Sequence, residues 1–201
     1  MITLYDAAQS GNAYKVRLLL ALLGLPHELK PVDLRAGQQK TPDYLKLNPM
    51  GQVPCMTDGD VTLRDSQAIL VYLGAKYGGE QWLPLDPFGL AVVHQWLSSA
   101  ANEIARGPAL ARACRKFGRT GYESAKASAD AFLPQLEAHL AKNDWLALGR
   151  PTVADIACYP YVGLAPEGDL DLAPYPAIRA WCGRIERLPS YVPMPGLPVA
   201  A

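Results

Sequence analysis

The spacing of apolar residues predicts strands and a helix at the start of the chain. Short β-type segments at residues 1–5 and 27–32 flank a helical segment that ends at Gly24, with Pro26 beyond it. The apolar residues of this helix recur at i, i+3, i+4 and i+7: Val16, Leu19, Leu20 and Leu23. A strand, a helix and a strand within about thirty residues predict a βαβ unit with parallel strands.

Two further apolar runs predict a β-hairpin. They occupy residues 53–57 and 61–63 and flank Asp58-Gly59, a pair typical of the type I′ turn, which needs positive φ. Pro54 lies in the first run and cannot donate to a ladder. This run is therefore expected to be an edge strand or to begin at the proline.

The rest of the pattern predicts two domains. Helical spacing returns after the hairpin and ends at Gly78-Gly79, so residues 1–78 predict a compact α/β domain with a mixed sheet. Residues 79–87 break the pattern and are predicted to be a linker. Helical patterns then predict an all-α domain over residues 88–201, with a proline-rich tail expected to lie extended on the surface.

Composition and charge exclude several classes of partner. The 201 residues carry 19 basic and 19 acidic side chains, so neither nucleic acid nor an anionic membrane is expected as the main partner. No apolar run of about 18 residues occurs, which predicts no transmembrane helix. The first residues lack a basic segment and reach Asp6 early, unlike a secretory signal.

The cysteines predict a reducing compartment. They are widely spaced, with no CxxC pair and no Cys/His cluster: Cys55, Cys114, Cys158 and Cys182. This spacing favours buried, reduced thiols in a cytoplasmic protein, and no metal site is expected.

Four segments together resemble the cytosolic glutathione S-transferases. They are SGNAYKVRLLLALLG at 10–24, NPMGQVP at 48–54, LRDSQAILVYL at 63–73 and PTVADIACYPYV at 151–162. In this order and spacing the resemblance covers nearly the whole chain. It implies a thioredoxin-like N-terminal domain, an all-α C-terminal domain, a homodimer, and glutathione as the co-substrate.

The family's reaction would join the glutathione thiol to a hydrophobic electrophile. A free thiol has a pKa of about 8.5, so only a few per cent is ionised at pH 7. Ser10, just before the first helix, offers a hydroxyl donor and a helix N-terminus, and resemblance to serine-type members makes it the first choice. Asn12, through its amide, and Tyr5, near the catalytic tyrosine of other classes, stay open, as does stabilisation by water or backbone amides alone. A plain N-cap role for Ser10 also stays open.

The resemblance also implies a set of glutathione-binding residues. They are Lys40, Gln52, Val53, Pro54, Asp65 and Ser66. A cis peptide bond between Val53 and Pro54 would let the Val53 backbone pair with the cysteinyl part of glutathione. Gln52 would bind the γ-glutamyl end. Lys40 would bind the glycine carboxylate, and a role as a solvated surface lysine stays open for it.

Asp65 and Ser66 would complete this glutathione site. Ser66 and the amides at the start of the following helix would hold the γ-glutamyl carboxylate, and Asp65 would meet the ammonium. A role limited to helix capping stays open for both residues, because capping alone favours these residue types.

The helical domain offers fewer residues with an assignable role. Arg106, Arg112, Arg115 and Tyr122 are candidates for the electrophile pocket. Asp155, in a capping-box-like segment, resembles the family's capping residue and is expected to act in folding rather than catalysis.

The predicted function is a glutathione transferase, and two alternatives stay open. The first is a non-catalytic module that binds glutathione or a protein, because a fold by itself proves no function. The second is a glutathione-dependent peroxidase or dehalogenase, which would use the same thiolate.

Overall fold

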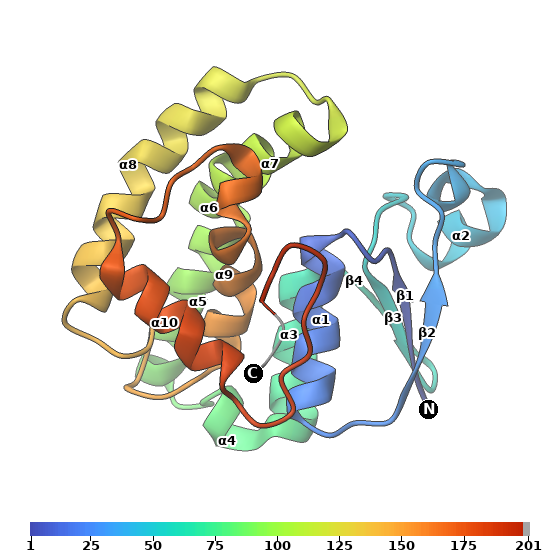
Figure 1. Cartoon of the computed structure of the whole chain (residues 1–201). Coiled ribbons are helices and arrows are strands. Elements are labelled where there is room, and N and C mark those ends of the chain that lie inside the picture. Colours follow the sequence, from blue (N-terminus) through green and yellow to red (C-terminus); the bar gives the residue numbers. More distant parts are fainter. Residues whose placement is uncertain (199–201) are drawn as a thin grey trace.

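A four-stranded mixed sheet lies beside a group of helices in the computed structural model, which describes residues 1–198 (Figure 1). The strands are β1 (Ile2–Asp6), β2 (His27–Pro31), β3 (Cys55–Asp58) and β4 (Val61–Arg64), in the order β2-β1-β3-β4. β1 is parallel to β2, and β3 is antiparallel to both β1 and β4. The predicted βαβ unit and mixed sheet are therefore confirmed.

Helices cover both faces of this sheet. The helical segments up to residue 82 are α1 (Gly11–Leu22), η1 (Gln38–Lys40), α2 (Pro42–Leu47), α3 (Ser66–Leu73), η2 (Gly74–Gly78) and α4 (Gly79–Trp82). Side chains alternate along a strand. Leu4 therefore packs in the core shared with α1 and α3, whereas Tyr5 packs with Tyr44 of α2.

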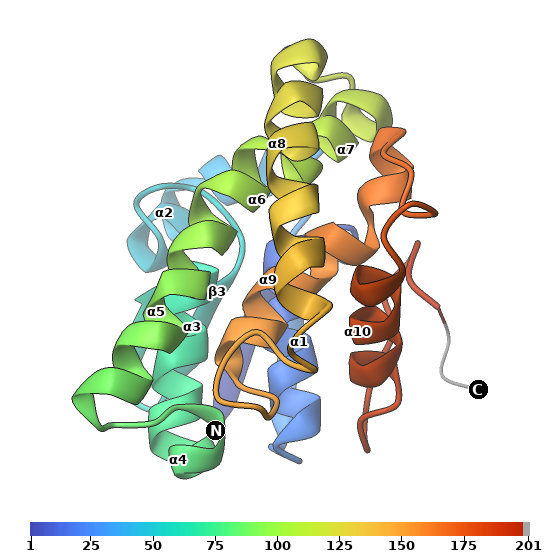
Figure 2. The ribbon, with the colours of Figure 1, turned by 90° about the vertical axis from the view of Figure 1, so that its left-hand side faces the viewer.

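The C-terminal domain is helical, as the sequence predicts. Its segments are α5 (Pro87–Ala101), α6 (Glu103–Arg106), α7 (Pro108–Phe117), α8 (Tyr122–Leu140), α9 (Val153–Gly163), η3 (Ala165–Gly168) and α10 (Pro176–Glu186). α9 contacts both α1 and α5, and Figure 2 shows α8 on its outer side. The buried helix α9 thus joins the helical domain to the sheet domain. The division at residues 79–87 stays a prediction.

The hairpin turn differs from the predicted one by one residue. Asp58 pairs with Val61, so Gly59 and Asp60 form the loop. Gly59 has φ of 59°, and Asp60 is not among the residues with positive φ, so the predicted type I′ turn at Asp58-Gly59 is wrong. The reason is tertiary: the Asp58 carboxylate accepts hydrogen bonds from Tyr72 at 2.9 Å and Lys76 at 2.7 Å, which hold Asp58 within the strand.

The tail does not lie simply on the surface. Tyr191, Met194 and Leu197 are buried, and the Tyr14 hydroxyl of α1 donates to the Val192 carbonyl at 2.8 Å. Figure 1 shows this segment (red) crossing α1. For the tail up to residue 198 the surface prediction is wrong, because apolar side chains alternate with the prolines and pack into the interior. Residues 199–201 of the predicted tail lie outside the described part of the chain.

Two other predictions concern the whole chain. All four cysteines are free thiols, and Cys114 alone is not fully buried, which confirms the prediction of reduced, mostly buried thiols. Within residues 1–198, no helix combines the length and apolar character needed to cross a membrane.

Candidate functional site

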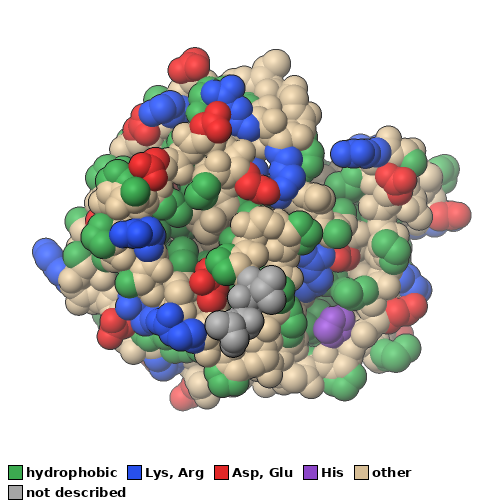
Figure 3. Space-filling view, in the orientation of Figure 1, with side chains coloured by type: hydrophobic (Ala, Val, Ile, Leu, Met, Phe, Trp, Pro, Cys, Tyr) green, Lys and Arg blue, Asp and Glu red, His purple; other side chains and the backbone are tan. Residues whose placement is uncertain are grey.

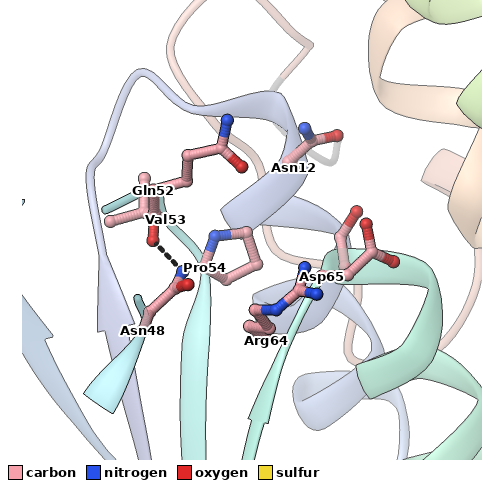
Figure 4. A pocket seen from close by; sticks show the side chains of 8 residues that line it. Asn12, Asn48, Gln52, Val53, Pro54, Arg64 and Asp65 are labelled. Carbon is pink, nitrogen blue, oxygen red and sulfur yellow. Dashed lines mark hydrogen bonds between the residues drawn. The ribbon is translucent and has the colours of Figure 1, made fainter. Parts of the chain in front are cut away.

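A pocket lies where the sheet edge meets the N-termini of α1 and α3 (Figure 4). Three segments line it: Asn12; Asn48, Gln52, Val53 and Pro54; and Arg64, Asp65 and Ser66. All but Asn48 and Arg64 are site residues that the sequence predicted. Segments far apart in the chain are therefore brought to one place.

The loop before Pro54 is held by side chains. The Gln52 carbonyl accepts hydrogen bonds from the Asn48 amide at 2.7 Å and the Tyr44 hydroxyl at 2.8 Å. The Val53–Pro54 peptide bond is cis, as the resemblance implied. The ladder begins only at Cys55, so the Val53 backbone stays free of strand pairing. An extended ligand backbone can therefore pair with Val53.

Asp65 caps α3 in a strained conformation. It has φ of 72° and ψ of 126°, and its Oδ1 accepts from the amides of Gln67 at 2.9 Å and Ala68 at 3.1 Å. A non-glycine residue in such a region costs about 1–3 kcal/mol, and such strain concentrates at functional sites. Ser66 is buried beside it, and its hydroxyl donates to the Gln67 side chain. The capping role is thus present, and both residues still line the pocket.

Arg64 is a site residue that sequence reasoning missed. It ends β4 opposite Cys55, and its exposed side chain makes no hydrogen bond or ion pair within residues 1–198. Of the described lining residues, Arg64 alone is basic. Its position directly before Asp65-Ser66 was the signal that could have identified it.

Lys40 lies outside the lining residues. Its exposed ammonium donates to the Met50 carbonyl at 3.1 Å, on the loop that leads to Gln52. Gly51 leaves room for this side chain, since a Cβ on Gly51 would stand 2.7 Å from the Lys40 nitrogen. Lys40 therefore borders the site without entering it.

Ser10 is the N-cap of α1. Its Oγ accepts a hydrogen bond from the Ala13 amide at 3.2 Å, and within the described residues its hydroxyl hydrogen has no acceptor. Ser10 is half-buried and is not a lining residue, whereas Asn12 is. Both predicted donors lie at the positive end of the helix dipole.

Tyr161 of α9 lies behind this end of α1. A Cβ on Gly11 would be 2.7 Å from the Tyr161 ring carbon that carries the hydroxyl, so only glycine fits. Burial raises the pKa of Tyr161, while Arg112 and the amides of Asn12 and Gly11 act in the opposite direction. The C-terminal domain therefore contributes directly to the environment of the first turn.

Tyr5 is not brought to the pocket. Its ring stacks edge-on against Tyr44, with centroids 6.0 Å apart, and Lys30 lies 5.7 Å from the same ring. Strand alternation points Tyr5 toward α2, on the sheet face opposite α1. Tyr5 is therefore not a lining residue of the pocket, whereas Asn12 is.

The candidate electrophile-binding residues do not line the pocket beside Pro54. Arg112 is buried, and Arg106 is exposed on α6. The Tyr122 hydroxyl donates to the Gly168 carbonyl at 3.2 Å, and Arg115 stacks on the Tyr122 ring at 3.6 Å. Figure 3 shows Lys and Arg side chains on both sides of the notch between the helical domain and the α2 region.

Comparison with known families matches both domains. The family model for the N-terminal domain of glutathione S-transferases matches residues 9–76, and that for the C-terminal domain matches residues 100–189. Glutathione S-transferase 3 of Zea mays is 32% identical over 98% of this chain and 97% of its own length. The matches to four plant glutathione S-transferases, the first a zeta-class protein of Euphorbia esula, cover only 46–60% of those proteins.

Solved structures agree. A possible glutathione S-transferase from Rhodopseudomonas palustris is 35% identical, with a TM-score of 0.89 over 100% of this chain and 93% of that one. A glutathione transferase homologue from Drosophila mojavensis, solved with bound glutathione, is 30% identical, with a TM-score of 0.84 over 94% of this chain and 88% of that one. The chain belongs to the glutathione S-transferase family.

Proposed function

We propose that this protein is a glutathione transferase. It binds glutathione in the pocket beside Pro54, stabilises the thiolate at the N-terminus of α1, and adds it to a hydrophobic electrophile. The observation that carries the proposal is one pocket that joins the unpaired Val53 backbone, the strained Asp65-Ser66 cap and Asn12 of α1.

The charges of the pocket complement those of glutathione, which has two carboxylates and one ammonium. Asp65 binds the γ-glutamyl ammonium, and the backbone amide of Ser66 binds the neighbouring carboxylate with help from Arg64. Lys40, bordering the site, meets the glycine carboxylate. Gln52 and Val53 hold the peptide between these ends. The unpaired state of Arg64 within residues 1–198 supports its assignment, because an unpaired guanidinium favours a bidentate carboxylate.

Activation of sulfur needs a modest free energy. Lowering the pKa of the thiol by about two units requires about 2.7 kcal/mol of preferential stabilisation of the thiolate. The Ser10 hydroxyl and the α1 N-terminus supply it together, because a donor hydrogen bond and the positive end of the dipole both favour the anion. Asn12 is the alternative donor, supported by its place in the pocket wall.

The thiolate then attacks an electrophilic carbon. A sulfur–carbon bond forms with the sulfur electron pair. The leaving group departs with the electrons of its bond, or, at a conjugated double bond, the adjacent carbon takes a proton from water. The protein's contribution is to hold the thiolate and the electrophile in reacting geometry.

We also propose a cytoplasmic homodimer. Four free thiols support a reducing compartment. Ala68 and Val71 of α3 face Leu97 and Ala101 of α5 across an open groove, which supports burial of this surface against a second copy. Sedimentation across micromolar concentrations tests the dimer, and a monomer throughout would rule it out.

The test of the main proposal is the ultraviolet thiolate absorbance of bound glutathione, titrated from about pH 5 to 9. A bound pKa well below the free value of about 8.5 supports a transferase site. Binding with an unshifted pKa, together with no turnover across a broad electrophile panel, would instead identify a non-catalytic binding module.

A further inference from the structure

Arg112 of α7 connects the helical domain to the loop before α1. Its side chain is 3% exposed, and its Nε donates to Glu167 of η3 at 2.5 Å. Its Nη1 donates to the Gln9 carbonyl at 3.1 Å. Lys116 forms an ion pair with the second oxygen of Glu167. Arg112 is thus a buried, paired cation whose remaining hydrogen bond goes to the residue before Ser10.

The bond to Gln9 acts on the orientation of Ser10. The Gln9 carbonyl and the Ser10 amide belong to one planar peptide unit. Arg112 holds the carbonyl, and the Ser10 amide donates to the Ala7 carbonyl at 2.8 Å. With both ends held, rotation of this peptide is restrained, and so is the backbone that carries Ser10.

A second contact from the same domain limits movement on the other side of Ser10. The ring of Tyr161 packs against Gly11, where a Cβ would be 2.7 Å from two ring carbons. Ser10 therefore lies between a peptide held by Arg112 and a residue covered by Tyr161. A hydroxyl that must donate to sulfur needs its position held within about 0.5 Å.

We propose that Arg112 is a positioning residue for the thiolate-stabilising hydroxyl of Ser10. The inference rests on the proposed function and deepens it, since it assigns the helical domain a part in sulfur activation as well as in electrophile binding. The simpler reading is that Arg112 only ties the domains together. Lysine cannot replace it, because one ammonium lacks the planar fork that reaches Glu167 and the Gln9 carbonyl together.

Arg150 provides a matched control for the simpler reading. It also donates to backbone carbonyls far away in the chain, to Glu80 at 2.8 Å and to Gln81. These carbonyls lie in α4, outside the pocket wall. Arg150→Met therefore removes an arginine tie between the helical domain and the distant α4 segment without touching the Ser10 loop.

The experiment measures the pKa of bound glutathione and the pH profile of kcat/KM in four variants: Arg112→Met, Arg112→Lys, Arg150→Met and Ser10→Ala. We expect Arg112→Met to raise the bound pKa by about one unit and lower kcat/KM about tenfold below that pKa, with recovery at high pH. The Kd of Arg112→Met for glutathione should stay within about threefold of the wild-type value. Arg150→Met keeps the wild-type bound pKa even if it lowers the melting temperature.

A double-mutant cycle tests the route through Ser10. In the Ser10→Ala background, Arg112→Met is expected to change the bound pKa by less than about 0.3 unit, because the residue it positions is gone. Should Arg112→Met fail to fold, Arg112→Lys, which keeps the buried charge beside Glu167, takes its place in the cycle, with the same direction of shift expected.

Two outcomes overturn the inference. One is a folded Arg112 variant in which bound glutathione has the same pKa as in wild type. The other is an Arg112 substitution that shifts this pKa equally with Ser10 present and with Ser10 replaced by alanine. If the proposed transferase function itself is wrong, the result differs: the wild-type protein would then bind glutathione without lowering the pKa of the glutathione thiol.

Discussion

The side-chain oxygen of Ser10 accepts the amide hydrogen of Ala13 over 3.2 Å. This bond caps α1 and uses one lone pair of the hydroxyl oxygen, so the hydroxyl hydrogen stays available to a ligand. One side chain can therefore stabilise the helix and a thiolate at once, and substitutions at this position should separate the two effects.

Ser10→Ala should lower stability and turnover together. Loss of the cap costs about 0.5–2 kcal/mol, and loss of the donor should lower turnover about tenfold or more with glutathione affinity retained. Urea unfolding and steady-state kinetics measure the two effects. Ser10→Thr, which keeps cap and donor, is the control. Unchanged turnover in Ser10→Ala, with a large loss in Asn12→Ala, would assign the donor role to Asn12.

Arg64→Ala should weaken glutathione binding. Removing the basic side chain of the pocket wall takes away a charge-assisted hydrogen bond of about 1.5–3 kcal/mol, so Kd should rise about tenfold or more while turnover at saturation is kept. Isothermal titration calorimetry measures this change. Arg35→Ala, at another exposed arginine, should leave Kd unchanged. An unchanged Kd in Arg64→Ala would remove Arg64 from the site.

Asp155→Ala should destabilise the fold without a specific catalytic effect. The buried carboxylate accepts hydrogen bonds from Trp181 at 2.9 Å, Leu146 at 3.0 Å and the Thr152 amide at 2.9 Å. Its removal leaves these donors unpaired, and we expect a loss of about 3–5 kcal/mol in the free energy of unfolding by urea.

Asp171→Ala is the control for Asp155→Ala. Asp171 is exposed and accepts one amide hydrogen bond, from Ala173 at 2.8 Å. Its loss should change stability by less than about 1 kcal/mol. If the two substitutions lowered the free energy of unfolding equally, the buried hydrogen bonds of Asp155 would contribute no more to stability than the exposed one of Asp171.

Lys15 should make the free energy of unfolding depend on pH in the alkaline range. Its ammonium is fully buried, has no hydrogen-bond partner within residues 1–198, and lies 5.3 Å from the Tyr161 ring centroid. Burial lowers the pKa of Lys15 to about 8, against 10.5 for a solvated lysine such as that of the unfolded chain. Between these values the unfolded state binds more protons, so this residue makes the free energy of unfolding rise with pH.

Lys15→Met should remove this dependence. Below about pH 8 the cost of burying the charge is fully present, so the variant should be more stable than wild type, by on the order of 3 kcal/mol at pH 7. The difference should shrink as pH rises from about 8 toward 10.5. Urea unfolding at pH 7 and 9.5 compares the proteins, and a difference independent of pH would contradict the lowered pKa of Lys15.

Local patterns in the sequence determined the fold class and most elements. Apolar spacing predicted the βαβ unit, the hairpin and the helical second half, because strand and helix periods depend on near neighbours in the chain. The capping box at Thr152 placed the start of α9 for the same reason: its partners are three residues apart. The pocket residues that the structure brings together, such as Gln52 and Asp65, lay in segments recognisable by motif.

Contacts between distant parts of the chain decided the features that local patterns did not show, which are the buried tail, the position of Arg112 and the place of Arg64 in the pocket. Tyr14 and Val192 are 178 positions apart, and their hydrogen bond helps to bury a tail that composition alone assigned to the surface. Arg112 and Gln9 are 103 positions apart, so no local pattern could show that Arg112 turns inward to the Ser10 loop. Arg64 acquired its place in the pocket in the same way. The sequence specifies these contacts only through the packing of the whole chain, since each depends on where an entire helix or strand comes to lie.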